Sequence, residues 1–118
     1  MPHRILARAE LAHLLAVVAH PLRLALLLEL KGGERDVTTL MRAVGASQTA
    51  VSQSLARLRA ARLVVDRRDG RHVRYRLALQ GLADWLDGGL ALLEDEAAQF
   101  QLVHDAIAQA RRDLGTES

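Results

Sequence analysis

Hydrophobic residues recur every three or four positions in five stretches of this chain, a spacing that predicts five helices. The first stretch covers residues 9–18 and places leucines and Val18 on one face. The second begins at Pro21, a residue suited to the first turn of a helix, and its leucines cover more than one face, which indicates a core helix. The glycines at positions 32 and 33 end this second helix.

The third and fourth helices are short and separated by a tight turn. The third ends at Gly45, because glycine readily adopts the left-handed conformation that follows a helix, and Ser47 is expected to cap the fourth. Two helices joined in this way predict a helix-turn-helix over residues 37–62. Its second helix has an apolar stripe, formed by Val51, Leu55 and Leu58. The residues that face away from this stripe are polar: Gln48, Thr49, Ser52 and Gln53.

Residues 63–78 change to a period of two, which is typical of a β-hairpin. Val73, Tyr75 and Leu77 alternate with basic residues, and Asp69-Gly70 is expected to form the two-residue turn. A helix-turn-helix followed by such a hairpin is a winged helix. The predicted fold is therefore mainly α with a small β wing, in the order α-α-α-α-β-β-α.

From Gln80 onward the chain predicts a helix of about 35 residues, roughly 50 Å long at 1.5 Å per residue. With 118 residues, half of them hydrophobic, the chain is expected to form one domain, too small to cover such a helix. We therefore expect a homodimer in which residues 1–19 and 80–118 supply the dimerisation helices. The expected interface residues are Leu11, Leu14, Leu93, Phe100 and Ile107.

Positive charge is concentrated in the middle of the chain. Residues 47–76 hold eight arginines against two aspartates, whereas residues 77–118 hold two arginines against eight acidic residues. Arginine suits phosphate oxygens and base edges, so the middle segment predicts contact with double-stranded DNA. A symmetric dimer would place its two recognition helices about one turn apart, on a near-palindromic operator.

The polar start of the fourth helix and the basic residues around it have different expected roles. Gln48, Thr49, Ser52 and Gln53 are predicted to read base edges, where glutamine pairs with adenine and hydroxyls serve either base type. Contacts to the DNA backbone are expected from a second set of residues. These are Ser47, Arg57, Arg67, Arg68, Arg71 and Arg74.

The chain has no cysteine, which excludes thiolate metal sites and thiol redox chemistry in it. It also lacks a glycine-rich phosphate loop, a nucleophile elbow and a Cys/His dyad, so we do not expect an enzyme. No signal peptide or membrane-spanning run is visible, and a cytoplasmic location is expected.

Histidines offer the remaining candidate chemistry. His20 is expected to cap or pack a helix, and His72 to meet a phosphate or solvent. His13, His104 and Asp105, with Glu94 or Glu96, form a candidate Ni²⁺ or Zn²⁺ site at the dimer interface, since imidazole and carboxylate bind both ions. The alternative interpretation is that these residues lie on solvated helix faces and that the protein needs no cofactor.

Three motifs occur in an order and spacing that are specific together: AHPLRL at 19–24, SQTAVSQSLARL at 47–58 and RRDGRHVRYRL at 67–77. In the last two, the matching positions are Ser47, Val51, Ser52, Leu55, Leu58, Gly70, Tyr75 and Leu77. With these motifs, residues 9–79 resemble the arsenic-repressor (ArsR/SmtB) family of bacterial winged-helix regulators. The resemblance implies a homodimeric repressor that releases DNA when it binds or loses a signal.

The chain departs from this family where its metal-sensing members hold their ions. Asp36 and Thr38 stand in place of two cysteines of the third helix, and Ser54 replaces a histidine of the recognition helix. On the last helix, Asp84 and His104 lack the partner ligands that the family places nearby. Three hypotheses stay open: a repressor with an unidentified signal, a Ni²⁺- or Zn²⁺-responsive repressor, and a winged-helix protein-interaction module without DNA binding.

Overall fold

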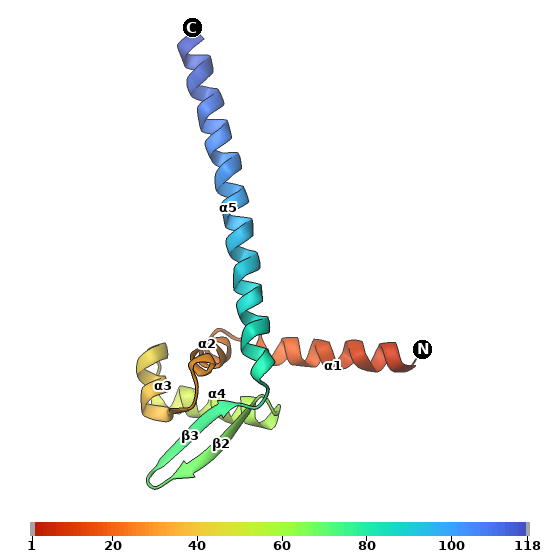
Figure 1. The fold of residues 1–118 in the computed structure, drawn as a ribbon, viewed down its shortest axis with the longest axis vertical. Helices are drawn as coiled ribbons and strands as arrows, with labels where there is room; N and C mark the ends of the chain where they lie inside the picture. The colour runs from red at the N-terminus through yellow and green to blue at the C-terminus, as the bar shows by residue number, and fades with distance from the viewer. Residues whose placement is uncertain (1, 118) are drawn as a thin grey trace. The chain divides into compact units, whose positions relative to one another are not determined.

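The computed structural model describes residues 2–117 and confirms the winged helix-turn-helix (Figure 1). Its helices are α1 (Pro2–Val18), α2 (Pro21–Glu29), a 3₁₀ helix η1 (Leu30–Gly32), α3 (Val37–Val44), α4 (Gln48–Ala60) and α5 (Gln80–Glu117). Its strands are β1 (Arg35–Asp36), β2 (Val64–Asp69) and β3 (His72–Leu77). The fold divides into two compact units, one up to Asp84 and one from Trp85 onward.

Side chains cap three of the helices, and each caps the first free amide groups of its helix. The His20 imidazole accepts from the Leu22 amide at 3.3 Å, which confirms a capping role for this histidine at the start of α2. Asp36 caps α3 through the Thr39 amide at 2.8 Å, and Ser47 caps α4 through the Ala50 amide at 3.1 Å. Between them Gly45 is left-handed, with φ of 66°, as predicted.

The core of the first unit is built around α2. Leu26 and Leu27 of α2 are fully buried, and α4 contributes its predicted apolar stripe. The other fully buried large side chains are Leu30, Leu40, Val64 and Leu77. At the start of α5, Leu82 and Ala83 are also buried. The three helices α2, α3 and α4 therefore share one apolar centre, which the hairpin joins through the buried ends of its two strands.

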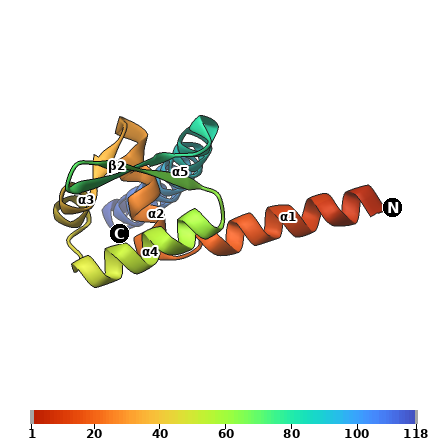
Figure 2. The ribbon, with the colours of Figure 1, turned by 90° about the horizontal axis from the view of Figure 1, so that it is seen from below.

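Helix α1 begins at Pro2, seven residues before the predicted start at residue 9. The prediction rested on the spacing of leucines, whereas Pro2 suits a first turn and the arginine, leucine and alanine that follow favour a helix. Only Val17 and Val18 of α1 are buried, and Arg23 of α2 holds the helix end by donating to the Val17 carbonyl at 2.6 Å. Figures 1 and 2 both show α1 extending away from α3, α4 and the hairpin.

The wing is a three-stranded antiparallel sheet of order β1-β3-β2, not the two-stranded hairpin that the sequence predicted. The predicted turn at Asp69-Gly70 is wrong by one residue, because Asp69 pairs with His72 and the turn is Gly70-Arg71. Gly70 has φ of 62° at the first turn position, where a type II′ turn prefers glycine. Asp69 thereby stays in β2, where its carboxylate accepts from Arg74 Nε at 3.0 Å.

Helix α5 continues without a break through Gly88 and Gly89. Neither glycine has a neighbour within 4 Å of a built Cβ, so neither marks a close contact within the chain. From Trp85 onward the large apolar side chains are exposed, except that Leu86 is partly buried. They include Leu90, Leu93, Phe100, Val103, Ile107 and Leu114.

None of the helices in residues 2–117 is by itself long and apolar enough to cross a membrane. The pair Pro2–Val18 and Pro21–Gly32 passes the same test only together, across a bend of 91°.

Candidate nucleic-acid interface

The first two turns of α4 carry exposed polar side chains, and the opposite face of the helix is buried in the core. Gln48, Thr49, Ser52 and Gln53 are all exposed. Val51, Leu55 and Leu58, on the opposite face, have no exposed surface. Because the apolar stripe packs in the core and Ser47 caps the helix, these four residues are held on one exposed face of α4. This is the arrangement that reads base edges in a major groove.

Much of the positive charge of the wing is paired with carboxylates of the same chain. Arg67 binds Glu34 through two guanidinium nitrogens, with Nε 3.3 Å from Oε2. Arg74 Nε lies 3.0 Å from Asp69 Oδ2. On α4, Arg59 Nη1 lies 3.2 Å from Asp66 Oδ2. Sequence analysis predicted Arg67 and Arg74 as DNA contacts, and both already have a partner.

Three other predicted backbone contacts differ from Arg67 and Arg74 in their pairing. Among residues 2–117 the structure shows no ion pair for Arg57, Arg68 or Arg71. Arg57 lies on the later part of α4, Arg68 on β2 and Arg71 in the turn of the wing. These guanidinium groups are the ones that can meet phosphates without first losing a partner.

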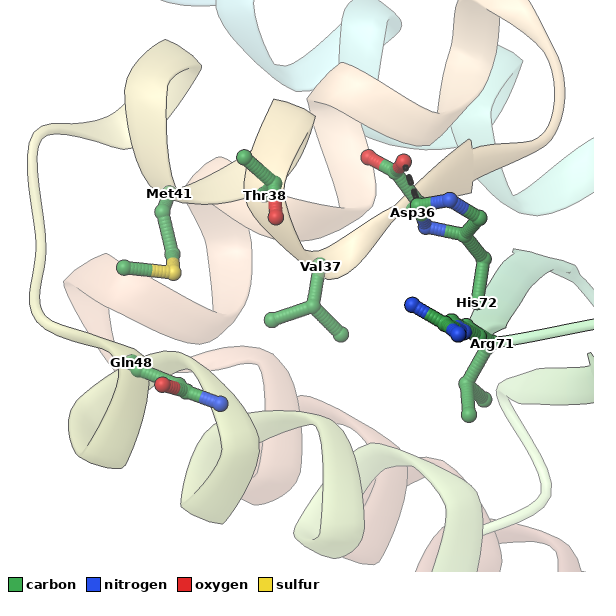
Figure 3. A pocket seen from close by; sticks show the side chains of 8 residues that line it. Asp36, Val37, Thr38, Met41, Gln48, Arg71 and His72 are labelled. Carbon is green, nitrogen blue, oxygen red and sulfur yellow. Dashed lines mark ion pairs between the residues drawn. The ribbon is translucent and has the colours of Figure 1, made fainter.

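A pocket of about 350 Å³ joins the start of α4 to the tip of the wing (Figure 3). Gln48 lines it from α4, and Arg71 and His72 line it from the wing. The remaining lining residues are Asp36, Val37, Thr38, Met41 and Val73. The fold therefore brings a predicted base contact and a predicted phosphate contact to the rim of one hollow.

Strand β1 brings two carboxylates to the wing. The sequence alone did not place them there. The strand pairs Arg35 with Tyr75 and Asp36 with Arg74, which brings Glu34 and Asp36 beside β3. The hydrogen bond from Arg67 lowers the pKa of the Glu34 carboxyl, and Arg74 and Arg76 lower it further by their charge. The two-residue strand has no periodicity of its own, so no pattern in the sequence could reveal it.

Hydrogen bonds lower the pKa values of two other wing carboxyls. The pKa of Asp36 falls mainly because its side chain accepts from Thr39, with a smaller contribution from the charge of His72. His72 Nδ1 lies 3.6 Å from Asp36 Oδ2, so this histidine faces a carboxylate. The pKa of Asp69 falls because Arg74 donates to it.

The candidate metal ligands lie on two helices, His13 on α1 and His104 with Asp105 on α5. In the part of the chain that the structure describes, no group of three or more histidine, aspartate or glutamate side chains has a metal-binding arrangement. His104 Nδ1 lies 3.5 Å from the neighbouring Asp105 Oδ1, and both side chains are exposed. A site shared between two copies, with His13, stays a prediction.

The fold and the exposed face of α4 define the class of protein: a winged helix-turn-helix of the kind that binds duplex DNA. The model of the bacterial regulatory proteins of the arsR family matches residues 20–65. The transcriptional repressor SmtB of Mycobacterium tuberculosis is 43% identical over 112 residues, which cover 95% of this chain and 69% of that protein. The chain therefore belongs to the arsR family.

Solved structures agree with this assignment. The transcriptional repressor BigR from Xylella fastidiosa superposes with a TM-score of 0.70 at 32% identity, over 78% of this chain and 95% of that one. The homodimeric winged helix-turn-helix DNA-binding domain Mb0332 from Mycobacterium bovis gives a TM-score of 0.74 at 25% identity. That similarity covers 84% of this chain and 92% of the Mb0332 chain.

Proposed function

We propose that the protein is a homodimeric transcriptional repressor that binds a specific DNA sequence and releases it in response to a signal. The observation that carries the proposal is the exposed polar start of α4, held by a buried stripe and the Ser47 cap. Gln48, Thr49, Ser52 and Gln53 read base edges. The similarity to SmtB and BigR, both transcriptional repressors, supports repression as the direction of the regulation.

Arg57, Arg68 and Arg71 hold the DNA backbone in this proposal, together with Ser47. All four residues are exposed, and the arginines lie on α4, on β2 and in the turn of the wing. The pocket between Gln48 and Arg71 lies where the segment that reads bases meets the segment that holds phosphates. Phosphate contacts set the register of α4 on the duplex, and base contacts set the sequence.

The dimer forms through the apolar faces of α1 and α5. Leu11 is 49% exposed, Leu93 58%, Phe100 76% and Ile107 58%, so these large apolar side chains are open to a partner helix. In α5, Leu86, Leu93, Phe100, Ile107 and Leu114 recur every seven residues, the repeat of a helix that packs along another helix. The homodimeric state of Mb0332 supports a dimer.

Two measurements test the proposal. Fluorescence anisotropy should show binding to the duplex from upstream of the gene that is at least tenfold tighter than binding to a scrambled duplex at the same salt concentration. Light scattering after gel filtration should give a dimer for the natural chain and a monomer for Phe100→Glu. Equal affinity for both duplexes would contradict sequence-specific binding, and no affinity for either at low salt would favour the protein-interaction module.

A further inference from the structure

Two neighbouring arginines of β2 lie in opposite surroundings. Arg67 stands opposite Arg74 in the sheet, and Arg68 stands opposite Val73, so the two side chains leave the strand on different faces. Arg67 donates two hydrogen bonds to Glu34, a residue 33 positions earlier in the chain. For Arg68 the structure shows no ion pair within residues 2–117.

Glu34 is the centre of a network on the face that carries Arg67. The Glu34 side chain is 28% exposed, against 56% for Arg67, and the charges of Arg74 and Arg76 also act on its carboxylate. Arg74 continues the network to Asp69. A single exposed ion pair contributes little, but a two-pronged arginine–carboxylate pair within a network is the arrangement in which such pairs do contribute.

We infer that Glu34 withholds Arg67 from DNA and thereby limits the affinity of the protein for DNA of any sequence. Arg67 is then a positioning residue, which ties β2 across β3 to the segment before β1, while Arg68 is the arginine of this strand that meets a phosphate. With Nε and Nη2 bound to Glu34, Arg67 can offer these two donors to a phosphate only by leaving Glu34, and the unpaired carboxylate would then lie beside the DNA. Affinity that is independent of sequence grows with the number of phosphates that the protein neutralises, so a withheld arginine favours specificity.

The inference rests on the proposed DNA binding, and the experiment separates the two. The affinity for a duplex of random sequence is measured between 50 and 200 mM salt for the natural chain and for Glu34→Gln. The variant should bind the random duplex more tightly, and the slope of log affinity against log salt should steepen by about 0.9, the value for one further phosphate contact. The ratio of affinities at the two salt concentrations should then rise about 3.5-fold.

Three controls assign this gain to Arg67. Glu29→Gln removes the same charge from an exposed residue at the end of α2 and should leave the slope near that of the natural chain. The double variant Glu34→Gln/Arg67→Ala should lose the gain. Arg68→Ala should lower the slope of the natural chain by about 0.9, whereas Arg67→Ala should change it far less and should instead lower the melting temperature.

The results distinguish failure of this inference from failure of the proposed DNA binding. If the natural chain binds random duplex and Glu34→Gln does not change the slope, the inference is wrong and the proposed function stands. The inference is also wrong if Arg67→Ala lowers the slope as much as Arg68→Ala does. If the natural chain binds no duplex DNA at all, the proposed function fails, and the inference fails with it. Circular dichroism of each variant confirms that a change in affinity does not come from unfolding.

Discussion

The start of α4 and the wing look alike in sequence but differ in the folded protein. Both segments are rich in polar residues, and arginines follow the start of α4 and recur throughout the wing. In α4 the four predicted base contacts are exposed, above a stripe with no exposed surface. In the wing, Arg67 and Arg74 pair with carboxylates of the same chain. A count of arginines therefore overstates the positive surface that the wing offers to DNA.

The comparison also shows why the two segments should respond differently to mutation. The side chains of α4 depend on buried packing for their direction, whereas those of the wing depend on hydrogen bonds between charged groups at the surface. Loss of buried packing costs several kcal/mol, and loss of exposed ion pairs costs much less. Mutations that remove buried packing should therefore have larger effects on stability than mutations that break an ion pair at the surface.

The largest effect is expected at the base of α4. Leu55→Ala should lower the free energy of unfolding by about 2 to 5 kcal/mol, because it removes a fully buried side chain and leaves a cavity. Chemical denaturation measures this change. Leu79→Ala, at a position that is 59% exposed, is the matched control and should cost far less. Similar losses for both variants would contradict the role of the buried stripe.

Loss of the cap should have an intermediate effect. Ser47→Ala removes the acceptor for the Ala50 amide and should lower the free energy of unfolding by about 1 kcal/mol. Ser47→Asp keeps an acceptor at the same position and should restore the stability. An equal loss in both variants, measured by denaturation, would show that the cap does not hold α4.

Arg71 and Arg74 offer a direct contrast within the wing. Arg71→Ala should weaken binding to all duplexes and lower the salt slope by about 0.9, since the structure shows no ion pair for it within residues 2–117. Arg74→Ala should change the slope less, because Arg74 is paired with Asp69. Salt titrations by anisotropy check both. A larger change for Arg74 would reverse the assignment.

The smallest expected effect is on the pH dependence of folding stability. Because the pKa values of Glu34 and Asp69 are lower in the folded chain than their ordinary values of 4.5 and 3.8, these groups stabilise the fold above those values. That stability should be lost as the pH falls through the lowered pKa values. Thermal melts between pH 6 and about pH 3 should therefore show a smaller decrease for Glu34→Gln than for the natural chain. Identical pH profiles would argue against a stabilising pair.

Much of the fold could be predicted because its elements have strong local signals. The Gly45 turn, the Ser47 cap and the stripe of Val51, Leu55 and Leu58 all follow from residue type and spacing, and the structure confirms them. The hairpin turn was misplaced by one residue, because Asp69-Gly70 and Gly70-Arg71 both suit a two-residue turn and only the strand register decides between them.

What could not be predicted depends on contacts between distant parts of the chain. Strand β1 has two residues, too few for a periodic pattern, and it forms only because β3 offers an open edge. It brings Glu34 to Arg67, a contact between residues 33 positions apart. The sequence therefore predicts which residues are basic, but the fold decides which of them are free to bind DNA.

The measurement that tests the central claim most directly compares Gln48→Ala with the natural chain on two duplexes at fixed salt: the operator and a random sequence. Gln48 is exposed at the first turn of α4. If α4 reads bases, the substitution should cost about 1 to 3 kcal/mol on the operator and leave the affinity for the random duplex nearly unchanged. An equal loss on both duplexes, or no loss on either, would contradict the assignment of base reading to the start of α4.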